Sequence, residues 1–304
     1  MSDTAASLRR KISSAGDLQS VVRTMKALAA SSIGQYENSV SALGDYYRTV
    51  ELGLGACFRQ REAAGVVLEK KRMTKAATIG AVVFGSDQGL VGQFNDVVAD
   101  FAVKALAERP GKSQVWAVGE RVHDRLLDTG LTPSGLFAVP TSINTIAPLV
   151  WQILVGQILV EQILIEHETH HDRSEVTELH LFYNRPQSGA IYAPVSQRLL
   201  PLDAAWRRQL AELPWPTKYL PEVMGDVSES LRALIREYLF VSLFRACAES
   251  LASENASRLA AMQRADKNID ELLETVHATF HRLRQNSIDE ELFDVISGYE
   301  ALLK

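Results

Sequence analysis

The stretch MQRADKNIDELLETVHATFHRL, residues 262–283, decides the fold because its apolar residues recur at alternating steps of three and four. This spacing puts them on one face of a helix and is close to a coiled-coil seam. The seam residues are Met262, Ala265, Ile269, Leu273, Val276, Phe280 and Leu283. Further apolar residues extend the face upstream: Leu231, Leu234, Tyr238 and Leu251. We therefore predict a helix from about residue 227 to about residue 286, roughly 90 Å long at about 1.5 Å per residue.

The N-terminal end of the chain repeats this pattern. Its stripe consists of Val22, Met25, Ala29, Ile33, Tyr36, Val40, Leu43, Tyr47, Val50 and Leu54. Four glycines weaken the helix, since each costs about 1 kcal/mol relative to alanine. The stripe nevertheless predicts a helix from about residue 5 to about residue 60, roughly 80 Å long.

Charge and proline positions indicate that these two helices pair with each other. All ten prolines lie between Pro110 and Pro221, so neither end carries this helix breaker. Residues 1–75 hold twelve Lys/Arg against seven Asp/Glu, and residues 222–304 hold nine against fifteen. Opposite net charges of +5 and −6 favour an antiparallel hairpin. The alternative is two separate amphipathic helices packed on the central segment.

The central segment alternates strand and helix patterns. We expect strands at about residues 77–84, 114–118, 136–139, 176–183 and 190–200, and helices at about residues 95–108, 120–128 and 148–167. Such alternation predicts a mostly parallel sheet covered on both faces. The fold class is therefore α/β, with a long antiparallel coiled coil of N- and C-terminal helices and a central Rossmann-like α/β domain. The expected division is 1–75 for the first helix, 76–221 for the α/β domain and 222–304 for the second helix.

The loop GSDQGLVG, residues 85–92, lies between a predicted strand and a predicted helix, where a phosphate-binding loop would occur. Its glycines are separated by three and two residues rather than by one and two, and no Gly-Lys-Ser/Thr follows. A tight backbone turn explains the glycines better than nucleotide binding does, although nucleotide binding remains the alternative. We predict no bound cofactor.

Histidines and cysteines give weak signals. His167 and His171 would share a helix face and could hold a metal with His170 or Asp172. A solvated helix end explains them better, because no carboxylate or cysteine spacing supports a metal site. The two cysteines, at positions 57 and 247, have no metal-ligand spacing. We expect two small buried residues in a reducing compartment, and no metal.

Several classes of protein are disfavoured. The net charge of −5 does not indicate nucleic-acid binding. We see no secretory leader, and the apolar window 143–165 contains too many polar residues for a membrane span, so we expect a buried helix there. Hydrolase and reactive-cysteine motifs are missing, so we do not expect an enzyme.

Three separated blocks resemble the gamma subunit of F-type ATP synthases. They are VVRTMKALAAS within residues 12–31, GSDQGLVGQFN at residues 85–95 and ESLASENASRLAAMQRADKNIDELL at residues 249–273. Weaker matches occur at Tyr183-Asn184, at LLPL in residues 199–202 and at Arg284-Gln285. The blocks follow the family's order along the whole chain.

The resemblance implies a central rotor shaft that couples ion flow through the membrane sector to ATP synthesis or hydrolysis. The coiled coil would lie inside a ring of alpha and beta subunits, which carries the catalytic sites. The α/β domain would face the epsilon subunit and the membrane c-type rotor ring, at the cytoplasmic face of a bacterial inner membrane. The chain would be peripheral and would not itself span the membrane.

The resemblance also implies partner contacts by individual residues. Met25 and Lys26 would face a lever loop of beta, and Arg258 and Gln285 would hydrogen-bond to the ring near the shaft tip. Further contacts are implied for Arg284, Gly89 and Gly92. The alternatives are an ordinary seam residue for Met25, and a solvated helix face for Lys26 and Arg258.

The chain departs from the family at several positions. Ser32-Ile33-Gly34-Gln35 replaces a basic stretch, and Asp289 replaces a threonine, so a carboxylate stands where a hydroxyl donor would be. These departures indicate a divergent branch of the kind called N-type. The competing functions are an α/β nucleotide-binding enzyme with helical oligomerisation arms and a coiled-coil scaffold.

Overall fold

The computed structural model describes residues 4–63, 78–156, 178–187, 190–202, 204–219 and 221–302. The chain forms two compact units, each built from both of its long helices. The first, here called the hairpin unit, comprises residues 1–30 and 258–304. The second, the body unit, comprises residues 31–257. Helix α1 (Ala5–Ala63) and helix α7 (Val227–Leu302) contribute to both.

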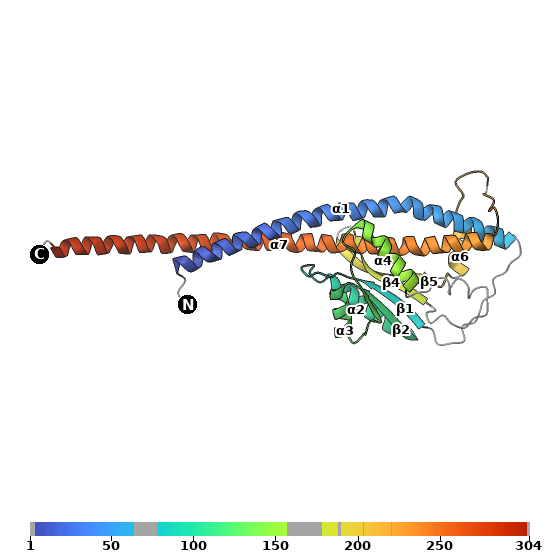
Figure 1. The fold of residues 1–304 in the computed structure, drawn as a ribbon, viewed down its shortest axis with the longest axis horizontal. Helices are drawn as coiled ribbons and strands as arrows, with labels where there is room; N and C mark the ends of the chain where they lie inside the picture. The colour runs from blue at the N-terminus through green and yellow to red at the C-terminus, as the bar shows by residue number, and fades with distance from the viewer. Residues whose placement is uncertain are drawn as a thin grey trace. The chain divides into compact units, whose positions relative to one another are not determined.

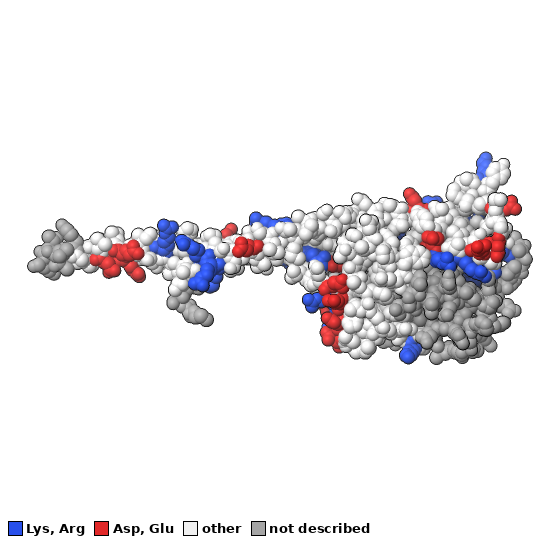
Figure 2. Space-filling view, in the orientation of Figure 1, with Lys and Arg blue, Asp and Glu red and all other residues white. Residues whose placement is uncertain are grey.

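In the hairpin unit, α1 and α7 run antiparallel (Figure 1). Their seam is a small cluster of three buried side chains, Val22, Met262 and Ile269, flanked by partly buried apolar residues. Those flanking residues are Ala15, Met25, Ala261, Ala265 and Leu273. On the face seen in Figure 2, acidic and basic groups are interspersed along this unit rather than segregated by sign.

The body unit is built on a five-stranded sheet in the order β3-β2-β1-β4-β5 (Figure 1). The strands are β1 (Thr78–Phe84), β2 (Lys112–Val118), β3 (Gly135–Phe137), β4 (Glu178–Gln187) and β5 (Ala190–Leu200). The first four are parallel to their neighbours, and β5 returns antiparallel along β4. The expected mostly parallel sheet is confirmed.

Helices cover both faces of this sheet. On one face, α2 (Phe94–Ala107) and α3 (Glu120–Asp128) pack on alternate residues of β1 and β2, such as Ala81 and Ala117. On the other face, α4 (Ile143–Gly156) and the body-unit parts of α1 and α7 pack on the intervening residues, such as Val82 and Trp116. Because successive side chains of a strand point to opposite faces, each strand contributes to two separate apolar cores.

Aromatic and small residues join α1 to α7 within the body unit. The Tyr47 and Tyr238 rings lie 5.7 Å apart, and Tyr46 donates a hydrogen bond of 2.8 Å to Glu237. Cys57 and Cys247 are free, and both are buried, as the sequence predicts. Burial raises the pKa of each thiol.

Two helix boundaries and one additional helix differ from the sequence predictions. Helix α7 continues to Leu302 instead of ending near residue 286, since no proline interrupts it. Helix α4 begins at Ile143, five residues earlier than predicted, and contains Pro148. Its first turn is capped by Ser142 and Thr145 hydrogen bonds, and burial of neighbouring aliphatic residues offsets the proline. Helix α6 (Ala204–Ala211) was not predicted.

Candidate functional site

The loop after β1 is a tight turn held by its own side chains. The Asn95 side chain accepts a hydrogen bond of 2.9 Å from the Ser86 backbone N–H and donates one of 2.9 Å to the Ser86 hydroxyl. A Cβ at Gly85 would lie 2.3 Å from Val122 Cβ, so only glycine fits there. The turn itself contains Leu90 and Gly92 at φ of 63° and 60°, a conformation that favours glycine.

Asp87 joins this loop to the N-terminus of α3. Its carboxylate accepts a hydrogen bond of 3.0 Å from the Glu120 N–H at the N-terminus of α3, and another of 2.8 Å from the Val139 N–H. Helix N-termini attract anions, and here the attraction is satisfied from within the chain. Together with the two Ser86–Asn95 hydrogen bonds, these contacts hold the loop as a turn and favour the backbone-turn interpretation of its glycines.

Helix α7 is fastened to this loop and to β4 by serines spaced four residues apart. Ser257 Oγ donates to the Val91 carbonyl, and Ser253 Oγ donates to the Asn184 carbonyl over 3.0 Å. Asn184 Nδ2 in turn donates to the Phe94 carbonyl over 2.9 Å. Both serines and Asn184 are buried, so these bonds satisfy groups that water cannot reach.

A buried carboxylate completes this junction. Glu249 Oε2 accepts from Arg185 Nε on β4 at 2.8 Å, and Glu249 Oε1 accepts from Arg245 Nε on α7 at 2.7 Å. The Glu249 side chain is 6% exposed, whereas each arginine is 43% exposed. Burial, reinforced by the negative charge of Glu249, raises the pKa of Tyr183 beside them to about 12.

The fold thus brings together blocks that the sequence keeps far apart. Residues 85–95, residues 183–185 and residues 249–257 meet in one polar junction within the body unit. Three of the matches quoted above lie wholly or partly in this junction. Of the predicted contact residues here, Gly89 is half-buried and Gly92 is exposed on the loop.

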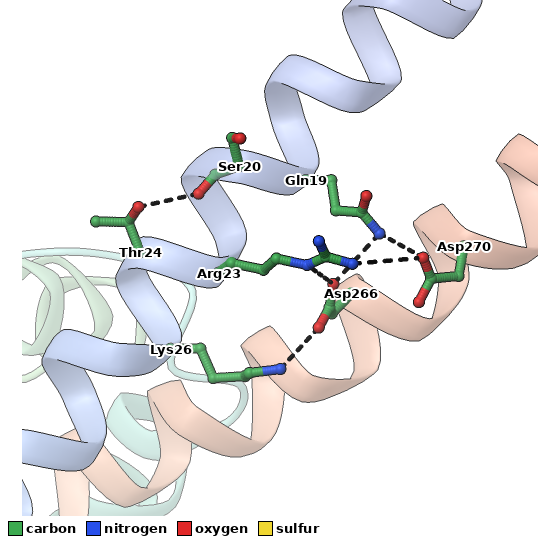
Figure 3. A network of polar contacts seen from close by, with 7 residues as sticks. All are labelled: Gln19, Ser20, Arg23, Thr24, Lys26, Asp266 and Asp270. Carbon is green, nitrogen blue, oxygen red and sulfur yellow. Dashed lines mark hydrogen bonds and ion pairs between the residues drawn. The ribbon is translucent and has the colours of Figure 1, made fainter.

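The hairpin unit contains a second polar cluster, shown in Figure 3. Lys26 Nζ lies 2.7 Å from Asp266 Oδ2, and Arg23 Nε lies 3.3 Å from Asp266 Oδ1. Gln19 donates to both Asp266 and Asp270. The hydrogen bond from Lys26, followed by that from Arg23, holds the pKa of Asp266 below its usual value.

The remaining predicted contact residues also lie in the hairpin unit. Met25 belongs to the flank of the apolar seam, as the alternative interpretation expected, and Arg258 is half-buried. Arg284 and Gln285 are exposed on α7. Arg284 lines an open groove of about 400 Å³ whose other walls include Ala5, Ala6 and Arg9 of α1 and Phe280 and Leu283 of α7.

Sequence reasoning predicted the pairing of the helices but not the residues that hold it. The charge difference between the two ends was the available signal, and it pointed to attraction without naming Gln19, Arg23, Asp266 or Asp270. Spacing offers a second signal, because residues 19, 23 and 26 share a helix face, as do residues 266 and 270.

Metal and membrane predictions are tested only in part. The histidines at 167, 170 and 171 lie outside the described residues. His180 is buried on β4, 3.2 Å from Glu178, and burial lowers its pKa. Within the described ranges there is no group of three or more side chains suited to a metal ion. The helices of those ranges also include none with the length and apolar character of a transmembrane span.

Comparison with known proteins identifies the family. A family model described as ATP synthase matches residues 4–302. The chain belongs to the ATP synthase gamma chain family. It is 29% identical over 308 residues to the ATP synthase gamma chain of Clavibacter michiganensis, with 96% of each chain covered. It is 25% identical over 301 residues to that of Geotalea daltonii, covering 97% of this chain and 98% of the relative.

Solved structures share the fold of this gamma-family chain. One chain of the Euglena gracilis mitochondrial ATP synthase, in an assembly described as OSCP/F1/c-ring, matches with a TM-score of 0.60 at 17% identity, covering 98% of this chain and 94% of that one. A chain of the Tetrahymena thermophila central stalk and c-ring matches with a TM-score of 0.53 at 23% identity, covering 81% and 99%. At these identities the two structures show that this gamma-family chain shares its fold with chains of ATP synthase assemblies.

Proposed function

We propose that this chain is the central rotor shaft of an F-type ATP synthase, coupling ion flow through the membrane sector to ATP synthesis or hydrolysis on an alpha/beta ring. The observation that carries the proposal is the family match along residues 4–302, on a chain whose two ends pair as an antiparallel helical hairpin. Paired helices resist bending and twisting better than loops do, as a torque-transmitting element requires.

The proposed mechanism follows from symmetry. A ring of three alpha and three beta subunits offers three equivalent catalytic sites, whereas a single two-helix shaft cannot be threefold symmetric. Each site therefore faces a different side of the shaft, and its conformational equilibrium is biased accordingly. Rotation carries each site through all three states. By reciprocity, turnover at the sites drives rotation of the shaft.

In this proposal the chain does no chemistry of its own. The arrangement around the loop at residues 85–92 supports this, because the Asp87 carboxylate and the Asn95 amide are engaged in holding the fold. Asp87 binds two backbone N–H groups, and Asn95 binds Ser86 twice. The ligand-binding role expected of an α/β enzyme would need at least some of these groups to face a substrate.

The proposed partners are the alpha and beta subunits around the hairpin, and the epsilon subunit and c-type rotor ring at the body unit. The proposed location is peripheral, at the cytoplasmic face of a bacterial inner membrane. Exposure supports partner contact by Arg284, Gln285 and Gly92. Lys26 retains 37% side-chain exposure beside Asp266, which supports contact of this side chain with a partner.

The test is ATP hydrolysis by cognate alpha and beta subunits mixed with and without the full chain, with size-exclusion chromatography of each mixture. We expect one copy of this chain per ring, strong stimulation of hydrolysis and no hydrolysis by the chain alone. Separate elution with unchanged hydrolysis would contradict the proposal. Nucleotide binding to the isolated chain in calorimetry would instead support an enzyme.

A further inference from the structure

The polar cluster of the hairpin unit is arranged around a single carboxylate. Gln19, Arg23 and Lys26 lie on one face of α1, and all three reach Asp266 on α7 (Figure 3). Asp270 lies one turn further along α7, 3.8 Å from an Arg23 nitrogen and bonded to Gln19. Two cations thus meet two carboxylates, and the charges balance.

Asp266 is also the most enclosed member of its ion pairs. Its side chain is 14% exposed, against 37% for Lys26, 58% for Arg23 and 56% for Asp270. Charge-assisted hydrogen bonds strengthen as water is excluded from them. Asp266 therefore contributes more to helix pairing than an ordinary surface carboxylate, whose ion pair is worth little.

The apolar seam beside this cluster is too slight to fix the helices by itself. Its buried cluster has three members, and three of its five flanking residues are alanines, which bury little area. Apolar contact is also non-directional, so it does not specify which residues lie opposite one another. Buried polar groups are the better-attested means of setting register between paired helices.

We propose that Asp266 is a positioning residue that clamps the first part of α1, residues 5–30, onto α7 and thereby sets where the Lys26 charge is presented. The positioning of Lys26 for a partner rests on the proposed function, whereas the clamp does not. Lys26 then has two roles at once: its ammonium group binds Asp266, and its remaining exposed surface faces outward.

The clamp is tested on the isolated full chain by hydrogen–deuterium exchange of peptides from residues 5–30. Asp266→Asn removes the charge with little change of shape, and we expect about fivefold faster exchange there. The matched control is Glu271→Gln, on the same helix, because Glu271 pairs with Lys267 of α7 and not with α1. That control should leave exchange unchanged. Unchanged exchange in Asp266→Asn, with circular dichroism confirming a helical chain, would overturn the clamp.

A charge exchange separates the clamp from the presentation of Lys26. In Lys26→Asp with Asp266→Lys the ion pair is rebuilt with reversed polarity, and Asp270 remains within reach of Arg23. We expect more exchange protection of residues 5–30 than in Asp266→Lys alone, because Lys26→Asp replaces one of the two cations, Lys26 and Arg23, that would repel the new lysine.

Hydrolysis by the complex with cognate alpha and beta subunits should stay below the wild-type rate in this double variant, since no cation stands at position 26. The single variant Lys26→Arg keeps a cation at this position, and its hydrolysis rate should be close to that of the wild type. Recovery of both readouts in the charge exchange would overturn the positioning role. A wild-type chain that does not stimulate hydrolysis would contradict the proposed function, and the exchange data would still decide the clamp.

Discussion

The buried carboxylate of Glu249 offers the sharpest test of how α7 is held to the sheet. Glu249→Gln keeps the size of the side chain and removes the charge that two arginines share. Each charge-assisted hydrogen bond contributes about 1.5–3 kcal/mol in proteins. Both arginine side chains are 43% exposed, so water solvates them in part when the carboxylate is lost. We therefore expect a loss of about 3 kcal/mol for the two bonds together, at the lower end of the range for breaking a buried pair.

The assay is thermal unfolding of the isolated chain, followed by circular dichroism and by a probe in the body unit. In a folding unit of about 150–250 residues, 1 kcal/mol shifts the unfolding midpoint by about 2–4 °C, so the expected fall is about 6–12 °C. Glu271→Gln, which removes an exposed ion pair whose glutamate side chain is 65% exposed, should shift the midpoint by less than about 2 °C.

Two results would refute this account of the junction. One is a Glu249→Gln variant that unfolds at the same temperature as the Glu271→Gln control. The other is strict additivity of Glu249→Gln and Arg185→Met in a double-mutant cycle, because groups that interact directly must show a coupling energy. Either would mean that the contact seen between β4 and α7 contributes nothing to stability.

Three further predictions follow from other parts of the body unit. Burial lowers the pKa of His180, so as the pH falls the unfolded chain binds a proton at this histidine before the folded chain does. The free energy of unfolding should therefore decrease below about pH 6.5, and urea titrations should show a smaller decrease in His180→Gln. Gly92→Ala should destabilise by about 1 kcal/mol because of its positive φ, whereas Gly89→Ala, which meets open space, should be close to neutral in the same titrations. Cys57 and Cys247 should resist a thiol reagent at pH 8 and react together once denaturant unfolds the chain, since burial raises both thiol pKa values.

The long helices and the sheet were predictable because each depends on a periodic pattern. Seam residues such as Ile269 and Val22 recur at helical spacing, and each strand is a short apolar run, so the element types follow from local order. The positions where these elements begin and end are less predictable from the sequence. From local sequence alone, Pro148 predicts a helix boundary. It nevertheless lies inside α4, where burial of Ile146 and Val150 outweighs the hydrogen bond that the proline cannot donate.

The polar junction was not predictable from sequence, although its parts were recognised. Asp87, Asn184 and Ser257 are separated by about seventy to a hundred residues, and no periodic pattern connects positions so distant. Each is a common polar residue that a sequence reading assigns to a loop, a strand end or a helix surface. Their roles appear only when the fold places an N–H or a carbonyl within about 3 Å of each, as at Val139 and Val91.

The two units differ in what holds them together, and the difference bears on function. The body unit carries two large apolar cores and a junction whose polar groups are internally bonded, so it can keep its structure unaided. The hairpin unit has a slight seam, the ion pairs of Asp266, and large apolar side chains exposed to solvent, including Phe293 at 67% and Val295 at 70% exposure. Long helices with so little mutual burial gain stability chiefly from a partner along their length. If the chain is a rotor shaft, that partner is the surrounding ring. The surface that this hairpin leaves uncovered is then the surface through which torque passes.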